Sequence, residues 1–332
     1  MDTDHPVLEL RDLRTEFRVG GQWHAAVRGV SLSVCKNETL AIVGESGSGK
    51  SVTALSVLRL LPEAGARHGS GAVLLEGEDL SAVSEKRMAA LRGNAIAMIF
   101  QEPMTSLNPT MTVGDQIAEA VRQHRKVSWR EARALALDTL NEVKIPGAEK
   151  RFDDYPHQFS GGMRQRVMIA MALACKPKVL LADEPTTALD VTIQAQILTL
   201  LHDLKTAYGM AVVFITHNLG VVAQIADRVA VMYAGEVVEL ADVNTLFARP
   251  THPYTEALLK AMPRVDLDSA VLEPIPGSVP AITAMPAGCA YASRCSLREA
   301  RCEQNHPPLS VLPDGRHQVR CIVRAEQFGG PA

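Results

Sequence analysis

The sequence predicts an α/β fold in which a mainly parallel β-sheet is covered by helices. Short β-branched and aliphatic runs alternate with longer amphipathic stretches as far as residue 240, the pattern of repeated strand-helix-strand units. Apolar residues make up 47% of the chain and charged residues 21%, values typical of a packed globular protein. The runs expected to form core strands are Leu40–Val43, Ile96–Phe100, Val179–Ala182 and Val212–Ile215.

A β-hairpin is predicted after these core strands. The runs Val229–Tyr233 and Glu236–Leu240 flank Ala234 and Gly235, and a two-residue connection of this kind is typical of a tight turn between antiparallel strands.

Helix formers dominate the stretch between Thr112 and Lys144, where no strand candidate is found. Residues Trp129–Val143 carry apolar side chains at helical spacing, which predicts an amphipathic helix. We therefore expect a helical subdomain at about residues 102–175, inserted into the α/β core.

A change of composition near residue 262 predicts a domain boundary. The chain is 332 residues long, and single hydrophobic cores stop growing at about 250 to 300 residues, so one large domain and an extension are expected. We assign residues 1–262 to the domain and 263–332 to the extension. The extension is rich in Pro, Gly and Cys, and its prolines are expected to break any regular element: Pro263, Pro274, Pro276, Pro280 and Pro286.

Several classes of function are disfavoured by charge and hydropathy. The net charge of -3 gives no basic excess, so a nucleic-acid partner is not expected. The first residues lack the basic and apolar regions of a signal peptide. The longest apolar run, Val167–Cys175, is about half the ~20 residues needed to cross a bilayer, so we expect any membrane association to come through a partner.

A phosphate-binding loop is predicted directly after the first core strand. The segment fits the P-loop pattern G-x-x-x-x-G-K-S/T, between an apolar strand and a helical stretch. Its glycines let backbone N–H groups surround a phosphate, Lys50 reaches the β and γ oxygens of ATP, and Ser51 is placed to ligate Mg²⁺. The expected nucleotide-binding residues are Gly44, Glu45, Ser46, Gly47, Ser48, Gly49, Lys50, Ser51 and Val52.

Two carboxylates end the strand Val179–Ala182. At the carboxyl edge of the sheet, Asp183 is placed to hold hydrated Mg²⁺, and Glu184 to polarise a water for in-line attack on the γ-phosphate. On its own such a pair is more often a solvated strand end, so this interpretation depends on the P-loop.

The segment Phe159–Arg166 resembles the signature motif of the ABC transporter ATPases. Ser160 and the two glycines can cap the following helix, which leaves its N–H groups available to an anion. In ABC ATPases this helix end faces the γ-phosphate held by the opposite subunit, so the resemblance implies a head-to-tail dimer with two sandwiched nucleotides. It also implies an antiparallel β-subdomain. The residues expected to act on the partner's ATP are Ser160, Gly161, Gly162, Gln165 and Asp190.

Other positions resemble the same family in their order along the chain. Gln101 resembles the Q-loop glutamine that senses Mg²⁺, and His217 resembles the switch histidine that contacts the γ-phosphate. Ala188-Leu189-Asp190 resembles the D-loop. Phe17 lies where the family places the aromatic residue that stacks on adenine, with Trp23 as a nearby alternative.

Three segments resemble one branch of this family, the dipeptide, oligopeptide and nickel importer ATPases. In that branch the C-terminal extension carries a cysteine pattern. The segments are Gln101–Pro109, Tyr155–Phe159 and His252–Thr255.

Four of the six cysteines follow residue 288, with the spacing C-x5-C-x6-C-x18-C. Four thiolates suit zinc and a 4Fe-4S cluster equally well by chemistry. The spacing lacks the C-x2-C pairs of zinc ribbons, and the resemblance to the peptide importers favours the cluster, with zinc or unligated thiols as alternatives. Cys35 and Cys175 are interpreted as ordinary thiols. The expected cluster ligands are Cys289, Cys295, Cys302 and Cys321.

The resemblance implies an importer motor that binds and hydrolyses MgATP. Its expected partners are a second ABC ATPase, in this branch a paralogue, two membrane permeases and a periplasmic or extracellular solute-binding protein. The expected location is the cytoplasmic face of the cell membrane. The alternative is a non-transport ABC ATPase that acts on DNA or ribosomes, although the chain has neither coiled-coil arms nor a second cassette. The sequence does not select among dipeptides, longer peptides, glutathione-like thiols and nickel complexes.

Overall fold

A computed structural model describes residues 5–101, 106–187, 189–262 and 275–329. Contacts divide the chain into two compact units. The first unit contains Met1–Leu8, Val34–Asn37 and Ala82–Phe214, and the second contains Glu9–Ser33, Glu38–Ser81 and Ile215–Ala332. Both units are assembled from segments that are far apart in the sequence. Within the described ranges, every helix is too short or too polar to cross a lipid bilayer.

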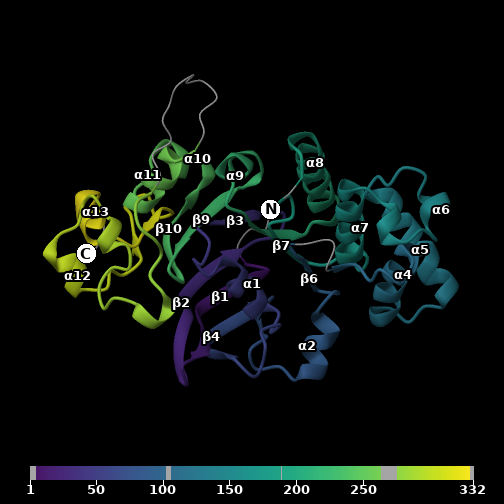
Figure 1. Ribbon diagram of the computed structural model, residues 1–332, viewed down its shortest axis with the longest axis horizontal. Helices are drawn as coiled ribbons and strands as arrows, with labels where there is room; N and C mark the ends of the chain where they lie inside the picture. The colour runs from purple at the N-terminus through teal and green to yellow at the C-terminus, as the bar shows by residue number, and fades with distance from the viewer. Residues whose placement is uncertain (1–4, 102–105, 188, 263–274, 330–332) are drawn as a thin grey trace. The chain divides into compact units, whose positions relative to one another are not determined.

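The first unit contains three strands in the order β8-β7-β6. It also contains a group of helices, of which α4, α5, α6 and α7 are labelled in Figure 1. Strands β6 and β7 are parallel, as the strand-helix-strand pattern predicts, and Ile96 lies opposite Val179. Helix α5 begins with a capping box, in which the Ser128 side chain accepts from the N–H of Glu131 and the Glu131 side chain accepts from the N–H of Ser128. The strands are β6 (Ile96–Ile99), β7 (Val179–Asp183) and β8 (Ala211–Ile215), and the helices are α2 (Glu85–Leu91), α4 (Val113–His124), α5 (Trp129–Glu142), α6 (Ala148–Arg151), α7 (Gly161–Leu173) and α8 (Val191–Tyr208).

An antiparallel four-stranded sheet, in the order β2-β1-β4-β5, forms one part of the second unit. Along β1, Leu13 and Thr15 are buried while Asp12 and Arg14 are exposed, so the two faces of the strand differ in polarity. The hydroxyl of Thr15 lies 2.7 Å from that of Ser56, which fixes this face against helix α1. The strands are β1 (Leu8–Val19), β2 (Gln22–Val34), β4 (Ala66–Leu75) and β5 (Glu78–Asp79), and the helix is α1 (Lys50–Val57).

The remaining strands of the second unit follow the order β11-β12-β10-β9-β3. Strands β3 and β9 are parallel, and β9 and β10 form the predicted hairpin. Ala234 and Gly235 both have positive φ (49° and 82°), as a two-residue type I′ turn requires. The elements are β3 (Thr39–Val43), β9 (Arg228–Tyr233), β10 (Glu236–Asp242), α9 (Leu219–Ile225), α10 (Val243–Ala248) and α11 (Pro253–Lys260).

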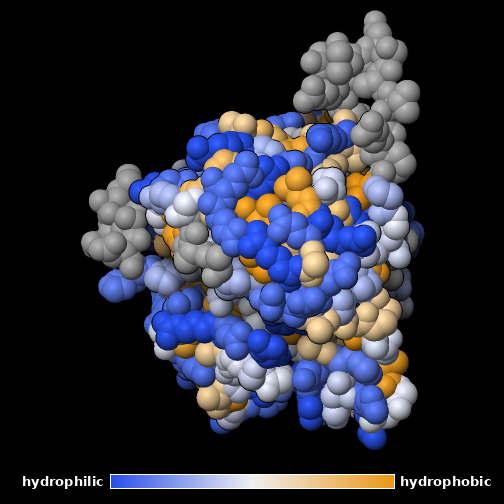
Figure 2. Space-filling model, turned by 90° about the vertical axis from the view of Figure 1, so that its left-hand side faces the viewer, coloured by the Kyte–Doolittle hydropathy of each residue, from blue (hydrophilic) through white to orange (hydrophobic). Residues whose placement is uncertain are grey.

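The C-terminal extension contains regular elements, although its prolines predicted none. Strand β12 pairs antiparallel with β10, with Val319 opposite Glu239, and so covers an edge that is otherwise open to other strands. Figure 2 views the side on which the extension lies and shows a surface that is mostly hydrophilic, with a few small apolar groups. The elements are η2 (Ile282–Ala284), η3 (Ala292–Arg294), α12 (Ala300–Gln304), β11 (Ser310–Val311), β12 (Gln318–Val319) and α13 (Ile322–Gln327).

The carboxylate of Glu239, which is fully buried, ties the extension to the rest of the second unit. It accepts hydrogen bonds from the N–H groups of Thr251 (2.7 Å) and His252 (2.8 Å), and its Oε1 lies 2.7 Å from Nε2 of His317. Burial lowers the pKa of His252 to about 4, so this imidazole is neutral at pH 7 and its Nδ1 accepts from the N–H of Tyr254 at the start of α11. Burying a carboxylate is costly unless its oxygens accept hydrogen bonds, so these three contacts anchor the extension to β10.

Candidate nucleotide site

The P-loop lies in the second unit, between β3 and α1. Gly44 has a φ of 152°, and a side chain there would place Cβ 2.2 Å from the carbonyl oxygen of Met232, so only glycine fits. Lys50 is buried, and its Nζ donates to the carbonyl oxygens of Gly44 (2.8 Å) and Glu45 (3.0 Å). The loop therefore folds back over its own lysine.

Two residues outside the motif hold Glu45 of this loop. The N–H of Glu45 donates to the Tyr254 hydroxyl at 2.8 Å, and burial raises the pKa of Tyr254, so this hydroxyl stays protonated. The Arg294 guanidinium pairs with the Glu45 carboxylate at 2.8 and 3.0 Å. The sequence analysis did not assign a role to either residue, although Tyr254 belongs to the segment His252–Thr255 that resembles the peptide importers.

Phe17 and Trp23, the two aromatic candidates for contact with the base, differ in their surroundings. Phe17 follows Thr15 by two residues on β1 and therefore lies on the face that contacts α1. The Trp23 ring is covered by the guanidinium of Arg67, 4.3 Å from the ring centre. It lines a polar cavity of about 640 Å³, together with Asp12 and Arg14 from the opposite face of β1. The two aromatic side chains therefore belong to different faces of this sheet.

The predicted carboxylates lie in the first unit, at the end of β7. Asp183 is buried, and Glu184 follows it with a φ of 47°, a conformation that turns the chain sharply away from the strand. Nε2 of Gln101 donates to Oε2 of Glu184 at 3.1 Å, and the Thr187 hydroxyl donates to the same oxygen at 2.9 Å. The structure thus brings Gln101 and Glu184 together, although they are 83 residues apart in the sequence.

The segment that resembles the ABC signature forms the start of helix α7, also in the first unit. The hydroxyl of Ser160 caps this helix by accepting from the N–H of Met163. At Gly162 a side chain would place Cβ 2.8 Å from the Ile193 side chain in α8, which identifies a close approach of the two helices. Asp190 caps α8, where its carboxylate accepts from the N–H of Ile193 at 2.9 Å. Two helix N-termini, which favour anions, are therefore neighbours here.

The remaining expected site residues are described by their position and exposure. His217 is exposed on the loop between β8 and α9, and the preceding Thr216 donates its N–H to the carbonyl of Ile42. Gln165 is buried within α7. Ser46 and Gly47 are exposed, and Ser51 and Val52 are partly buried at the start of α1. Ala188 of the D-loop segment and residues 102–105 after Gln101 lie outside the described residues.

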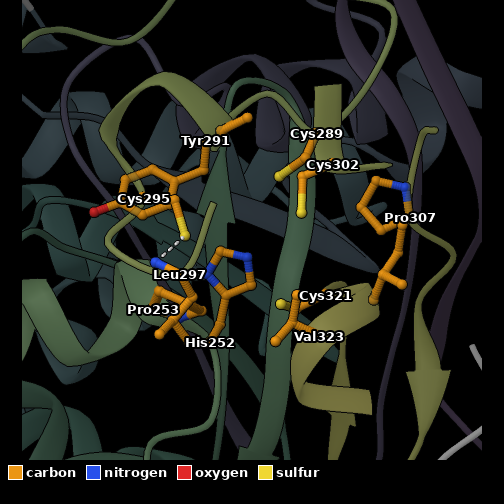
Figure 3. A pocket seen from close by; sticks show the side chains of 12 residues that line it. His252, Pro253, Cys289, Tyr291, Cys295, Leu297, Cys302, Pro307, Cys321 and Val323 are labelled. Carbon is orange, nitrogen blue, oxygen red and sulfur yellow. Dashed lines mark hydrogen bonds between the residues drawn. The ribbon is translucent and has the colours of Figure 1, made fainter. Parts of the chain in front are cut away.

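The four cysteines of the extension line one cavity. All are free thiols, and Figure 3 shows their sulfur atoms directed toward a common space. Gly288 allows this convergence, because a Cβ there would lie 2.4 Å from the carbonyl oxygen of Cys302. Burial raises the pKa of the Cys289 thiol to about 11 and also raises the pKa values of Cys295 and Cys321, which favours the protonated thiols.

The fit of this cavity to a metal centre is partial. Four free thiols are the right donors for a cluster or for zinc. The cavity has a volume of about 20 Å³, however, which is room for about one water molecule. Among the described residues, no three His, Cys, Asp or Glu side chains are arranged to hold a metal ion. The sulfur atoms must therefore move apart to enclose a cluster.

Comparison with known proteins gives matches to both parts of the chain. Residues 27–187 match the family model described as ABC transporter, and residues 238–302 match the model described as oligopeptide/dipeptide transporter, C-terminal region. A dipeptide transport ATP-binding protein, DppD, of Bacillus subtilis (strain 168) is 51% identical over 97% of this chain and 96% of its own length. A probable peptide ABC transporter ATP-binding protein of Sinorhizobium fredii (strain NBRC 101917 / NGR234), y4tR, is 54% identical over 95% of this chain and 94% of its own.

Solved structures agree with the sequence matches. A dimeric structure of the ATP-binding cassette MJ0796 in a post-hydrolysis state, bound to ADP and Pi, has a TM-score of 0.64 and 28% identity over 71% of this chain and 98% of its own. The chain therefore belongs to the ABC transporter family of ATP-binding proteins. Within that family it belongs with the dipeptide and oligopeptide group, which confirms the resemblance found in the sequence.

Proposed function

We propose that this chain is the ATP-hydrolysing subunit of an ABC importer and couples ATP binding and hydrolysis to the uptake of di- or oligopeptides. The observation that carries the proposal is the match to the dipeptide transport protein over 97% of the chain, which includes the extension as well as the cassette. This match favours transport over the alternative of an ABC ATPase that acts on DNA or ribosomes.

The nucleotide is proposed to bind on the P-loop, with the adenine on Phe17. Lys50 would contact the β- and γ-phosphates, and Ser51, Asp183 and Gln101 would hold Mg²⁺. Glu184 would polarise the attacking water, with His217 near the γ-phosphate. The hydrogen bonds from Gln101 and Thr187 to Glu184 support this role, because they fix the orientation of its carboxylate.

A second ABC ATPase, in this branch a paralogue, is proposed to complete each site. The N-terminus of α7 supports this proposal, since Ser160 and Gly161 are exposed and their helix end favours an anion. Val191, at the start of the neighbouring α8, has 84% of its surface exposed, as expected for an apolar residue that a partner covers. Gly162 and Asp190 lie at the same two helix ends, and Gln165, which is buried, follows within α7.

Two permeases and a solute-binding protein are the remaining proposed partners, with this subunit on the cytoplasmic face of the membrane. Residues 1–262 would act as the nucleotide-binding domain, with the helical subdomain at about 102–175 in contact with the permeases. Residues 263–332 would be a regulatory extension.

Purification from native membranes tests this proposal. A tagged copy of the full chain, extracted in mild detergent, is expected to co-purify with two permeases and a second ATPase. Mass spectrometry identifies these partners. The matched control is the same chain with Glu63→Gln, an exposed change between α1 and β4 and outside the helical subdomain, which should leave this set intact. Ribosomal or DNA-associated partners in place of permeases would reject the importer.

We also propose that Cys289, Cys295, Cys302 and Cys321 hold a 4Fe-4S cluster with a structural or regulatory role. The convergence of four free thiols on one cavity supports this assignment, and thiolates are the usual ligands of such clusters.

Anaerobic purification is expected to give about four iron atoms per chain and a brown colour. Cys321→Ser should lose most of the iron, because one ligand is removed, whereas Cys175→Ser, outside the extension, should retain it. Metal analysis and the visible spectrum provide the measurement. A colourless chain that contains zinc would contradict the cluster.

A further inference from the structure

The second residue of the P-loop, Glu45, is acidic. Glu45 directly follows Gly44, so its carboxylate belongs to the loop proposed to receive the triphosphate of ATP. Like charges repel each other, so an unpaired carboxylate in this loop would weaken the binding of a polyphosphate. The contacts of Glu45 therefore bear directly on the affinity of the loop.

The Glu45 side chain is paired with a cation from the extension, Arg294. Both nitrogen ends of the Arg294 guanidinium contact it, NH1 to Oε2 at 2.8 Å and NH2 to Oε1 at 3.0 Å. Only 4% of the Arg294 side chain is exposed, against 26% of that of Glu45. This two-point geometry fixes both the charge and the orientation of the carboxylate, and burial protects it from screening by salt.

Arg294 is itself held by all five of its N–H donors. In addition to the two bonds to Glu45, Nε donates to the carbonyl of Pro276 (2.7 Å), NH2 to that of Ile275 (3.4 Å) and NH1 to the hydroxyl of Tyr233 (3.3 Å). The guanidinium also lies over the rings of Tyr233 and Tyr291, at 5.7 and 5.8 Å from their centres. A guanidinium with every donor in use is a rigid partner for Glu45.

The backbone of Glu45 is a second point of connection. Its N–H donates to Tyr254, and its carbonyl accepts from Nζ of Lys50 and from the N–H of Ser48. The residue that Arg294 holds is therefore also the residue that positions the lysine of the loop. Arg294 lies in η3, directly before Cys295, so a single side chain joins the cysteine segment to the P-loop.

We propose that Arg294 is a positioning residue for nucleotide binding, which neutralises Glu45 and holds it so that the P-loop accepts the phosphates of ATP. This inference rests on the proposed nucleotide role of the loop. It gives the extension a specific task in the ATPase cycle, which is to maintain the phosphate affinity of the cassette. Arg294 does not touch the reacting atoms.

The test measures the affinity of the full chain for a fluorescent ATP analogue, N-methylanthraniloyl-ATP with Mg²⁺, by fluorescence anisotropy. Arg294→Met is expected to raise Kd about tenfold, because an unpaired carboxylate remains in the loop. Arg294→Lys, which keeps a cation, should bind within about threefold of wild type. The matched control is Arg298→Met, four residues further along, whose side chain is 54% exposed and pairs with the exposed Glu303, and it should not change Kd.

Rescue distinguishes this role from a general structural one. If the repulsion from Glu45 weakens binding, adding Glu45→Gln to Arg294→Met should restore most of the lost affinity. An Arg294→Met chain that binds like the Arg298→Met control would overturn the proposal, and so would a double variant as weak as Arg294→Met. If Arg294→Met unfolds at the assay temperature, as shown by circular dichroism, Arg294→Gln replaces it, because its amide retains a donor for the carbonyl groups of Ile275 and Pro276.

Failure of this inference and failure of the proposed function give different results. A wild-type complex that does not hydrolyse ATP would contradict the proposed function, whereas the Kd values still decide the role of Arg294. A wild-type complex that hydrolyses ATP, with Kd unchanged in Arg294→Met, would leave the function intact and remove Arg294 from it.

Discussion

Replacement of Lys50 by alanine is expected to lower the affinity for MgATP by about 100-fold or more. The Nζ of this lysine lies over the P-loop, on the carbonyl oxygens of Gly44 and Glu45, where the strand and helix on either side hold it in place. When a triphosphate enters, the ammonium group can contact the β and γ oxygens from this position, and charge-assisted bonds of this type are the strongest in such a site. The fluorescent analogue provides the measurement, as a Kd at fixed salt concentration.

Lys260→Ala serves as the control for this variant. Lys260 is exposed at the end of α11, so its removal changes the net charge of the chain by the same amount without touching the loop. The control should bind ATP like wild type. A Lys50→Ala chain that binds within about threefold of this control would show that the phosphates do not lie on the P-loop.

The strands near the centre of each unit could be predicted because their burial is a local property of the sequence. Every residue of β3, β7 and β8 is buried, and each strand contains a run of at least four apolar residues. Strand β4, in contrast, begins with Ala-Arg-His-Gly-Ser-Gly, and its first residues are mostly exposed. Glycine and polar residues argue locally against a strand, so pairing with β1 must overcome that tendency.

The short strands of the extension also depend on pairing with a distant part of the chain. Strands β11 and β12 contain two residues each, and no pattern of two residues predicts a strand. They form because β10 offers an open edge, and because His317, just before β12, contacts the buried carboxylate of Glu239. The prolines of the extension limit the length of regular elements, but they do not prevent the chain from completing a neighbouring sheet.

In the candidate site, motifs that are continuous in sequence could be predicted, whereas contacts between distant residues could not. The P-loop and the signature segment are continuous in sequence, and the residue types themselves carry the prediction. The pair of Arg294 and Glu45 joins positions 249 residues apart, and neither residue is distinguished by its neighbours. From one sequence, a salt bridge between such positions cannot be inferred, because any of the other acidic residues is an equally good partner on charge alone.

Glu184→Gln is expected to abolish ATP hydrolysis while ATP binding remains. The carboxylate of Glu184 accepts hydrogen bonds from Gln101 and Thr187 through Oε2, and an amide oxygen can accept the same two bonds. The shape of the site is therefore preserved, but an amide is a far weaker base than a carboxylate. General-base catalysis contributes about 100- to 10,000-fold to a rate, so kcat should fall by this amount. Phosphate release by the purified complex is the measurement.

The contrast between the two variants assigns separate roles to the two motifs. Lys50→Ala is expected to lose binding, whereas Glu184→Gln should keep the wild-type Kd and lose turnover, because the carboxylate acts on the water rather than on the bound phosphates. Glu149→Gln makes the same chemical change at an exposed position in α6 and should hydrolyse ATP normally. If Glu184→Gln hydrolysed ATP at the normal rate, the base would have to be a different residue. The hydrogen bond to Gln101 would then serve only to position the loop after β7.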